Sequence, residues 1–73
     1  MGNLAKITGN NIRLLRSSKG LSQKKLSEMC GVTRQTLVRL ENGENASLDI
    51  IEKISLSLNV PASLLLSINE VKA

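Results

Sequence analysis

Residues Gln23 to Asn42, QKKLSEMCGVTRQTLVRLEN, decide the fold of this chain. Their apolar positions recur at helical spacing, and Gly31 in the middle permits the positive φ of a tight turn. The pattern predicts two short helices, over 22–30 and 34–41, each preceded or opened by a Ser or Thr that can act as its N-cap. The residues expected to point inward are Leu26, Cys30, Val32, Leu37 and Leu40.

The three residues 31–33 form the connection of a helix-turn-helix, in which the second helix lies at roughly 90–120° to the first. Ser27 is small enough for the second helix to cross close above it. The inward residues leave an outward face on the second helix, made of Arg34, Gln35, Val38 and Arg39. Arginine reads guanine and glutamine reads adenine through paired hydrogen bonds in the major groove. We therefore expect the 34–41 helix to be a recognition helix for double-stranded DNA.

The flanking sequence predicts three further helices. The first covers 10–19 and ends at Gly20, a residue suited to the left-handed conformation after a helix. Another covers 47–58, and a short fifth helix starts at Pro61. No alternating, strand-like run is present. The predicted fold class is all-α: a compact five-helix domain in a single unit over residues 1–73, with its core at about 9–66.

The apolar residues of the flanking helices do not all lie on one face. The stripe expected to be buried in the 47–58 helix is Leu48, Ile51, Ile54 and Leu58. Leu14, Leu56 and Leu64 fall outside the stripes and are expected to be exposed in a monomer. Exposed apolar residues on a small domain favour a partner surface.

Composition excludes several classes of function. The chain has 73 residues, no aromatic residue and no histidine, so it has no aromatic platform for single strands and no His-based catalytic pair. It has one cysteine, Cys30, which we expect to be a free, small core residue in a reducing, cytoplasmic environment. No metal site, cofactor, membrane span or signal peptide is expected.

The charge is unevenly distributed along the chain. Residues 1–39 contain eight basic residues and one acidic residue, a net charge of +7, whereas residues 40–73 carry a net charge of −3. A cationic surface of this kind indicates a polyanionic partner, although a merely solvated charged surface would look the same.

Five segments occur in an order and spacing that carry a resemblance. They are Ile12-Arg13-Leu14-Leu15-Arg16, Gly20-Leu21-Ser22-Gln23, Leu40-Glu41-Asn42-Gly43, Ser47-Leu48 and Leu58-Asn59-Val60. With them the chain resembles the lambda-repressor-like, or Cro/CI, helix-turn-helix family over about 9–66. Departures are Ser27, where the family often has alanine, and Pro61, where a capping serine is common.

The resemblance implies roles for individual residues. The residues that would read bases are Thr33, Arg34, Gln35 and Arg39. For phosphate contacts the resemblance implies Gln23 and the backbone amides at Asn42 and Gly43. Further expected phosphate contacts, apart from the resemblance, are Lys24, Lys25, Thr36 and Arg13. Gln23 would also brace the recognition helix, and Arg16 would pair with Glu41 in a structural ion pair. Lys24, Lys25 and Arg13 could instead serve only solubility. The expected dimer interface comprises Leu56, Leu64, Ile68 and Val71.

The expected function is sequence-specific binding of double-stranded DNA by a transcriptional regulator, a repressor that binds a palindromic operator as a homodimer. One alternative is an antitoxin-type protein that binds a toxin partner and autoregulates its operon. A restriction–modification controller is another alternative and differs only in its target. The acidic residues are too dispersed for a catalytic dyad, so an enzyme is not expected.

Overall fold

Three of the five helices begin at hydroxyl caps, and these caps set where the elements start. The computed structural model describes residues 3–67. Ser22, Thr33 and Ser47 each accept a hydrogen bond from the backbone N–H three residues later, at 3.0, 3.0 and 3.1 Å. Each cap satisfies a donor that the first helical turn leaves unpaired. The helices that follow are α2 (Gln23–Cys30), α3 (Arg34–Glu41) and α4 (Leu48–Leu58).

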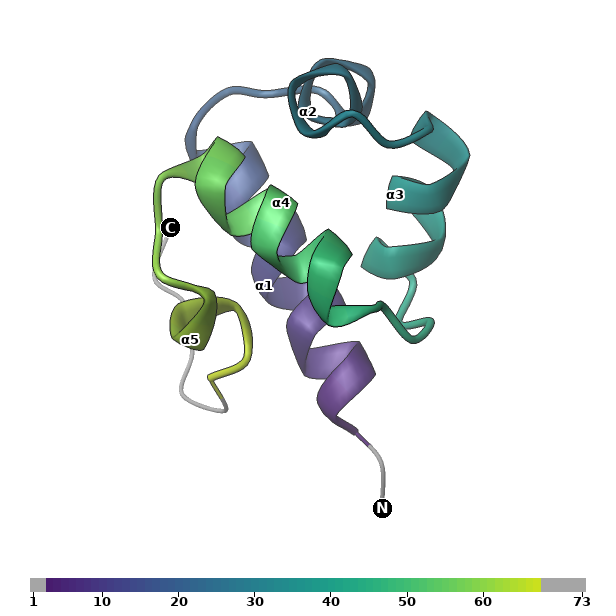
Figure 1. The fold of residues 1–73 in the computed structure, drawn as a ribbon, viewed down its shortest axis with the longest axis vertical. Coiled ribbons are helices and arrows are strands. Elements are labelled where there is room, and N and C mark those ends of the chain that lie inside the picture. The colour runs from purple at the N-terminus through teal and green to yellow at the C-terminus, as the bar shows by residue number, and fades with distance from the viewer. Residues whose placement is uncertain (1–2, 68–73) are drawn as a thin grey trace.

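The other two helices are α1 (Leu4–Ser18) and the short α5 (Ala62–Leu65), so the described chain is all-α with five helices. Figure 1 shows α4 crossing in front of α1, with α2 at the top, α3 at the right and α5 at the lower left. The predicted number and order of helices are therefore confirmed. Pro61 is the N-cap of α5 and not its first helical residue.

The first helix starts at Leu4, six residues before the predicted start. The sequence 9–11, Gly-Asn-Asn, is typical of a helix start because these residues have low helix propensity. In the structure the helix continues through them, and Gly9 lies against the backbone of Leu40. A Cβ atom at Gly9 would be 2.1 Å from the Leu40 carbonyl oxygen. Close packing of α1 against α3 therefore overrides the local preference.

The core is aliphatic, as the composition predicted. The fully buried side chains are Ile12, Leu26, Leu37, Ile54, Leu58 and Leu65. Cys30 is a free, buried thiol on α2, in agreement with the expected core role. The buried Asn11 amide of α1 donates to the carbonyl oxygens of Leu65 and Ser67, at 2.9 and 3.0 Å. These hydrogen bonds fix the end of α5 to the first helix.

Three expectations about apolar residues need correction. Leu48 is 79% exposed as the first residue of α4, whereas Ile51 one turn later is buried. It borders a groove of about 190 Å³ together with Leu4 and Leu66. Leu14 and Leu64 are half-buried and pack against the core, so the expectation that they are exposed was wrong.

Leu56 is 75% exposed on α4, as predicted. Of the residues assigned to a dimer interface, Leu56 thus exposes its apolar side chain. The Leu64 side chain is instead partly buried against the core of its own protomer. Ile68 and Val71 lie outside the described residues.

Candidate nucleic-acid interface

The turn between α2 and α3 has the geometry that the sequence predicted. Gly31 adopts a φ of 75°, which is the left-handed region that favours glycine. The N–H groups of Gly31 and Val32 both donate to the carbonyl oxygen of Ser27, at 3.0 and 3.1 Å. Ser27 is buried, and its hydroxyl donates to the carbonyl oxygen of Lys24 at 2.7 Å. Ser27 is therefore buried next to the turn, and its hydroxyl keeps a hydrogen-bond partner.

The outer surface of α3 presents three long polar side chains. Arg34, Gln35 and Arg39 are exposed, whereas Leu37 and Leu40 on the opposite face are 0% and 3% exposed. An eight-residue helix anchored in this way presents its polar face in a fixed orientation. This arrangement fits a helix that reads base edges in a major groove.

Two residues of α3 and its N-cap are less accessible to DNA than the sequence predicted. Val38 is half-buried, so it does not share the open face with its neighbours. Thr33 is exposed, but its hydroxyl caps α3 and donates to the Thr36 hydroxyl at 2.8 Å. Thr36 is half-buried. Base reading by Thr33 and phosphate contact by Thr36 would compete with this local pair.

Arg16 and Glu41, which were expected to pair, form a two-point ion pair between α1 and the end of α3. Arg16 Nε lies 2.7 Å from Glu41 Oε2, and Arg16 Nη2 donates to Oε1 at 3.1 Å. Arg16 Nη1 also donates to the carbonyl oxygen of Leu21 at 2.7 Å. The two side chains are only 14% and 3% exposed, so little water screens the pair.

The hydrogen bond to Glu41 raises the pKa of Arg16 above its ordinary value. Burial opposes this shift, and the charge of Glu41 adds to it. A folded-state pKa above the unfolded value adds stability at every pH below the unfolded value. This contribution is lost only as the pH rises through the raised pKa of Arg16.

Gln23 joins the same cluster from the first residue of α2. Its Nε2 donates to Glu41 Oε1 at 3.0 Å, and its side chain is half-buried. Of the two expected roles of Gln23, the structure therefore contains the brace, since the amide holds α2 to the end of α3. Its phosphate contact stays a prediction. If the side chain makes that contact, it would use the second N–H of the same amide, because the amide oxygen is only an acceptor.

The backbone amides after α3 are not free to hold a phosphate. Asn42 N–H donates to the carbonyl oxygens of Val38 and Arg39, at 3.0 and 3.1 Å. Gly43 N–H donates to Leu40 at 3.0 Å. Phosphate contact by the amides of Asn42 and Gly43 stays a prediction, and it would have to share donors that end α3 in this structure. The side chain of Asn42 remains exposed.

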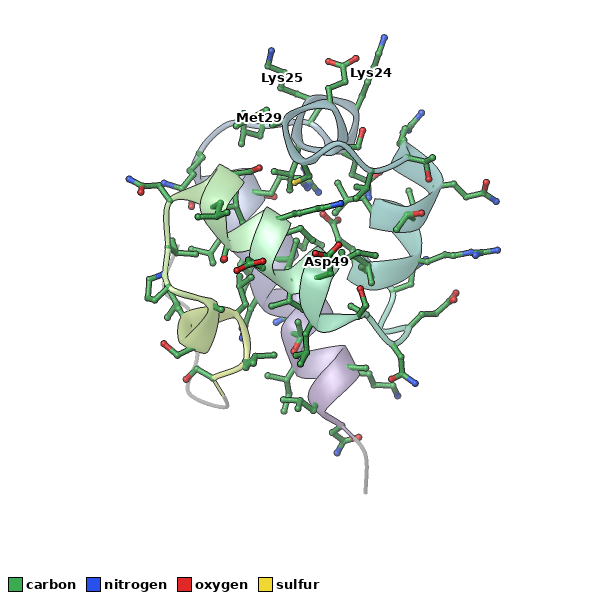
Figure 2. The ribbon with its side chains drawn as sticks, viewed as in Figure 1. Lys24, Lys25, Met29 and Asp49 are labelled. Atoms are coloured by element: carbon green, nitrogen blue, oxygen red, sulfur yellow. The ribbon has the colours of Figure 1, made fainter. Side chains whose placement is uncertain are left out.

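The remaining expected phosphate contacts are exposed cations. Figure 2 shows Lys24 and Lys25 projecting away from the domain, with Lys24 on the side nearer α3 in that view. Arg13 is exposed on α1, where its Nη2 donates to Oδ1 of Asn10. The acidic side chain of Asp49 lies on α4 and pairs with Lys53 at 3.4 Å, away from the two α2 lysines (Figure 2).

Within residues 3–67 there is no group of His, Cys, Asp or Glu side chains that could hold a metal ion. The same part of the chain has no helix long and apolar enough to cross a membrane. Sequence reasoning missed one cation near the interface, Lys6, because it placed this residue before the first helix.

A recognition helix held by a preceding helix and a glycine turn, with cations around it, defines a helix-turn-helix DNA-binding domain. Residues 12–65 match the family model described as Helix-turn-helix (HTH_3). The chain therefore belongs to this Cro/CI-like helix-turn-helix family, whose members are DNA-binding transcription regulators and not enzymes.

A curated relative, an uncharacterized HTH-type transcriptional regulator of Sinorhizobium medicae, is 43% identical over 56 residues. The match covers 75% of this chain but only 40% of that protein, so this chain corresponds to about two fifths of the relative.

Solved structures are similar over most of both chains. The hypothetical transcription factor NHTF from Neisseria superposes with a TM-score of 0.84 at 37% identity, covering 88% of this chain and 75% of that one. The restriction-modification controller protein C.AhdI from Aeromonas hydrophila superposes with a TM-score of 0.81 at 34% identity, covering 84% of this chain and 94% of that one. SinR, the master regulator for biofilm formation, was solved in complex with DNA. It superposes with a TM-score of 0.79 at 34% identity, covering 82% of this chain and 98% of that one.

Proposed function

We propose that this domain is a sequence-specific transcriptional repressor that binds a palindromic operator as a homodimer. The observation that carries the proposal is the exposed face of α3, where Arg34, Gln35 and Arg39 stand on a helix held by buried Leu37 and Leu40. Repression would follow when the bound dimer occupies DNA that overlaps a promoter.

In this mechanism α3 enters the major groove and its side chains hydrogen-bond to base edges. Arg34 or Arg39 would donate to O6 and N7 of a guanine, and Gln35 would pair with N6 and N7 of an adenine. Lys24, Lys25 and Arg13 would hold phosphates, which fixes the register of the protein but carries no sequence information. The cluster of Arg16, Gln23 and Glu41 would keep α3 at a fixed angle to the helices behind it.

A dimer is supported by the exposed apolar side chain of Leu56 near the end of α4. A two-fold dimer of this domain would place its recognition helices about 34 Å apart, so that they read half-sites one helical turn apart. Selection of bound sites from random DNA tests the whole proposal, since it yields the preferred sequence, its symmetry and the half-site spacing together.

A second candidate is a controller of a restriction–modification operon. It is favoured by the similarity to C.AhdI over 94% of the length of that chain. The DNA-binding mechanism would be the same and only the target would differ. The antitoxin-type alternative requires a toxin partner, and co-purification of a stable complex with the product of a neighbouring gene would distinguish it from both.

Gln35→Ala should relax specificity at one base pair of each half-site. A paired glutamine–adenine contact discriminates by about 1–3 kcal/mol, and its loss removes no charge. Binding to scrambled DNA and its salt dependence should therefore stay near the wild-type values. The measurement is titration of the variant against every single-base variant of the selected operator.

Lys24→Gln provides the contrast, because it removes a charge and no base contact. It should weaken binding to operator and scrambled DNA together and lower the salt slope by about 0.9 for each phosphate that the protein no longer neutralises. If Gln35→Ala ranks all operator variants as the wild type does, Gln35 is not a base reader. If Arg34→Ala and Arg39→Ala also keep the wild-type preference, α3 is not the recognition helix.

Leu56→Glu should weaken self-association and operator binding and leave the fold intact. Leu56 is the better position for this test than Leu64, because Leu64 packs partly against the core of its own protomer. Sedimentation measures the association, and far-ultraviolet circular dichroism checks the fold, since the chain lacks Tyr and Trp for other optical signals. A wild-type protein that sediments as a monomer when free and binds one copy per operator would refute the dimer.

A further inference from the structure

The N-terminal part of α1 lies against the loop that follows α3. Gly43 in this loop has a φ of 95°, and the position where its Cβ would stand is only 2.9 Å from Cγ of Lys6. Cα and Cβ of Lys6 are also close to that position, at 3.4 and 3.6 Å. The aliphatic stem of Lys6 therefore packs on Gly43, and the missing side chain of the glycine makes room for it.

The loop itself has few donors to offer to an anion. The N–H groups of Asn42, Gly43 and Glu44 all donate to carbonyl oxygens of α3, at distances between 3.0 and 3.1 Å. The C-terminal end of a helix carries a partial negative charge, and the exposed carboxylate of Glu44 adds another. A phosphate near this loop would need a cation supplied by a different segment.

Lys6 can supply that cation. Its side chain is exposed, and the two ion pairs found within residues 3–67 are Arg16–Glu41 and Lys53–Asp49, so no carboxylate in that part of the chain holds the Lys6 ammonium. A lysine ammonium is a strongly hydrated point charge on a flexible stem and binds phosphates in that way.

We propose that Lys6 is a phosphate-binding residue that contacts the DNA backbone beside the C-terminal end of α3. The inference rests on the proposed function. Because the N-terminal residues of a recognition helix contact the base edges, its C-terminal end and the following loop lie nearer the phosphate strand. Gly9 makes the contact possible, since it allows α1 to pack against α3 and so carries Lys6 to Gly43.

The test is a comparison of Lys6→Gln with Lys53→Gln, in operator and scrambled DNA across a salt series. Both variants lose one exposed lysine charge, but Lys53 is on α4 and already pairs with Asp49. Glutamine keeps the Cβ and Cγ atoms that pack on Gly43, and thermal melts should therefore match the wild type. The slope of log K against log salt should fall by about 0.9 per protomer for Lys6→Gln, or about 1.8 for a dimer.

Lys53→Gln should keep the wild-type slope, and Lys6→Arg should restore most of the slope that Lys6→Gln removes. Lys6→Gln should leave the preferred operator sequence unchanged. Equal slopes for wild type, Lys6→Gln and Lys53→Gln would overturn the role of Lys6 and leave the proposed function standing. A wild-type protein without affinity for any duplex would overturn both.

Discussion

Gly9→Ala should destabilise this domain by about 3 kcal/mol or more, the upper end of the cost of overpacking. In an exposed helix interior the same change stabilises by about 0.5–1 kcal/mol, because alanine is the better helix former. The opposite sign is expected here because the new Cβ would lie 2.1 Å from the Leu40 carbonyl oxygen. That oxygen belongs to the backbone, so α1 and α3 would have to separate.

Thermal melts followed by circular dichroism measure this effect, with Ser17→Ala as the matched control. Ser17 is exposed in the same helix, so its replacement should change stability by no more than about 0.5 kcal/mol. Small domains have a total stability near the low end of about 5–15 kcal/mol, which makes a loss of about 3 kcal/mol severe. A Gly9→Ala protein that melts at or above the wild-type temperature would show that α1 and α3 do not pack this closely.

Glu41→Ala should cost about 3–5 kcal/mol, the range for breaking a buried ion pair by removing one partner. The variant removes the carboxylate from the guanidinium of Arg16, whose side chain is 14% exposed in the wild-type structure, and it takes the acceptor from the Gln23 amide. Much of the folded population near 37 °C should be lost. Operator binding should fall with it, because the cluster holds α2 and α1 to the end of α3.

Glu52→Ala is the matched control for Glu41→Ala, because Glu52 is an exposed glutamate on α4. Its loss should change stability by at most about 0.5 kcal/mol. If the thermal melts of wild type and Glu41→Ala coincide, the Arg16–Glu41 ion pair does not stabilise the fold in the way a buried pair does. A double variant, Arg16→Met with Glu41→Leu, should recover part of the loss, since it leaves no unpaired buried charge.

Prediction from sequence succeeded where local signals were strong. The capping Ser22 and Thr33 and the glycine turn at Gly31 gave the positions of α2 and α3. The helix expected over 47–58 is α4, Leu48–Leu58. The outward arc of Arg34, Gln35 and Arg39 followed from the helical period once the inward leucines were assigned. The pairing of Arg16 with Glu41 came from the family resemblance and not from spacing, because 25 residues separate them.

Prediction was limited where burial and hydrogen bonding in the folded chain decided the outcome. Leu48 satisfied the helical stripe but is the first residue of α4 and stays 79% exposed. The N–H groups of Asn42 and Gly43 were expected to hold a phosphate, and in the structure they donate to carbonyl oxygens of α3.

The sequence by itself determined the all-α class, the aliphatic core, the two short helices of the motif and the polar face of α3. These features depend on caps, turn residues and periodicity, which act over a few residues. Only the tertiary structure decided where α1 begins, and with it the position of Lys6 beside Gly43. The physical reason is that Gly9 and its neighbours are weak helix formers alone, and contact between α1 and α3, far apart in the chain, makes them helical.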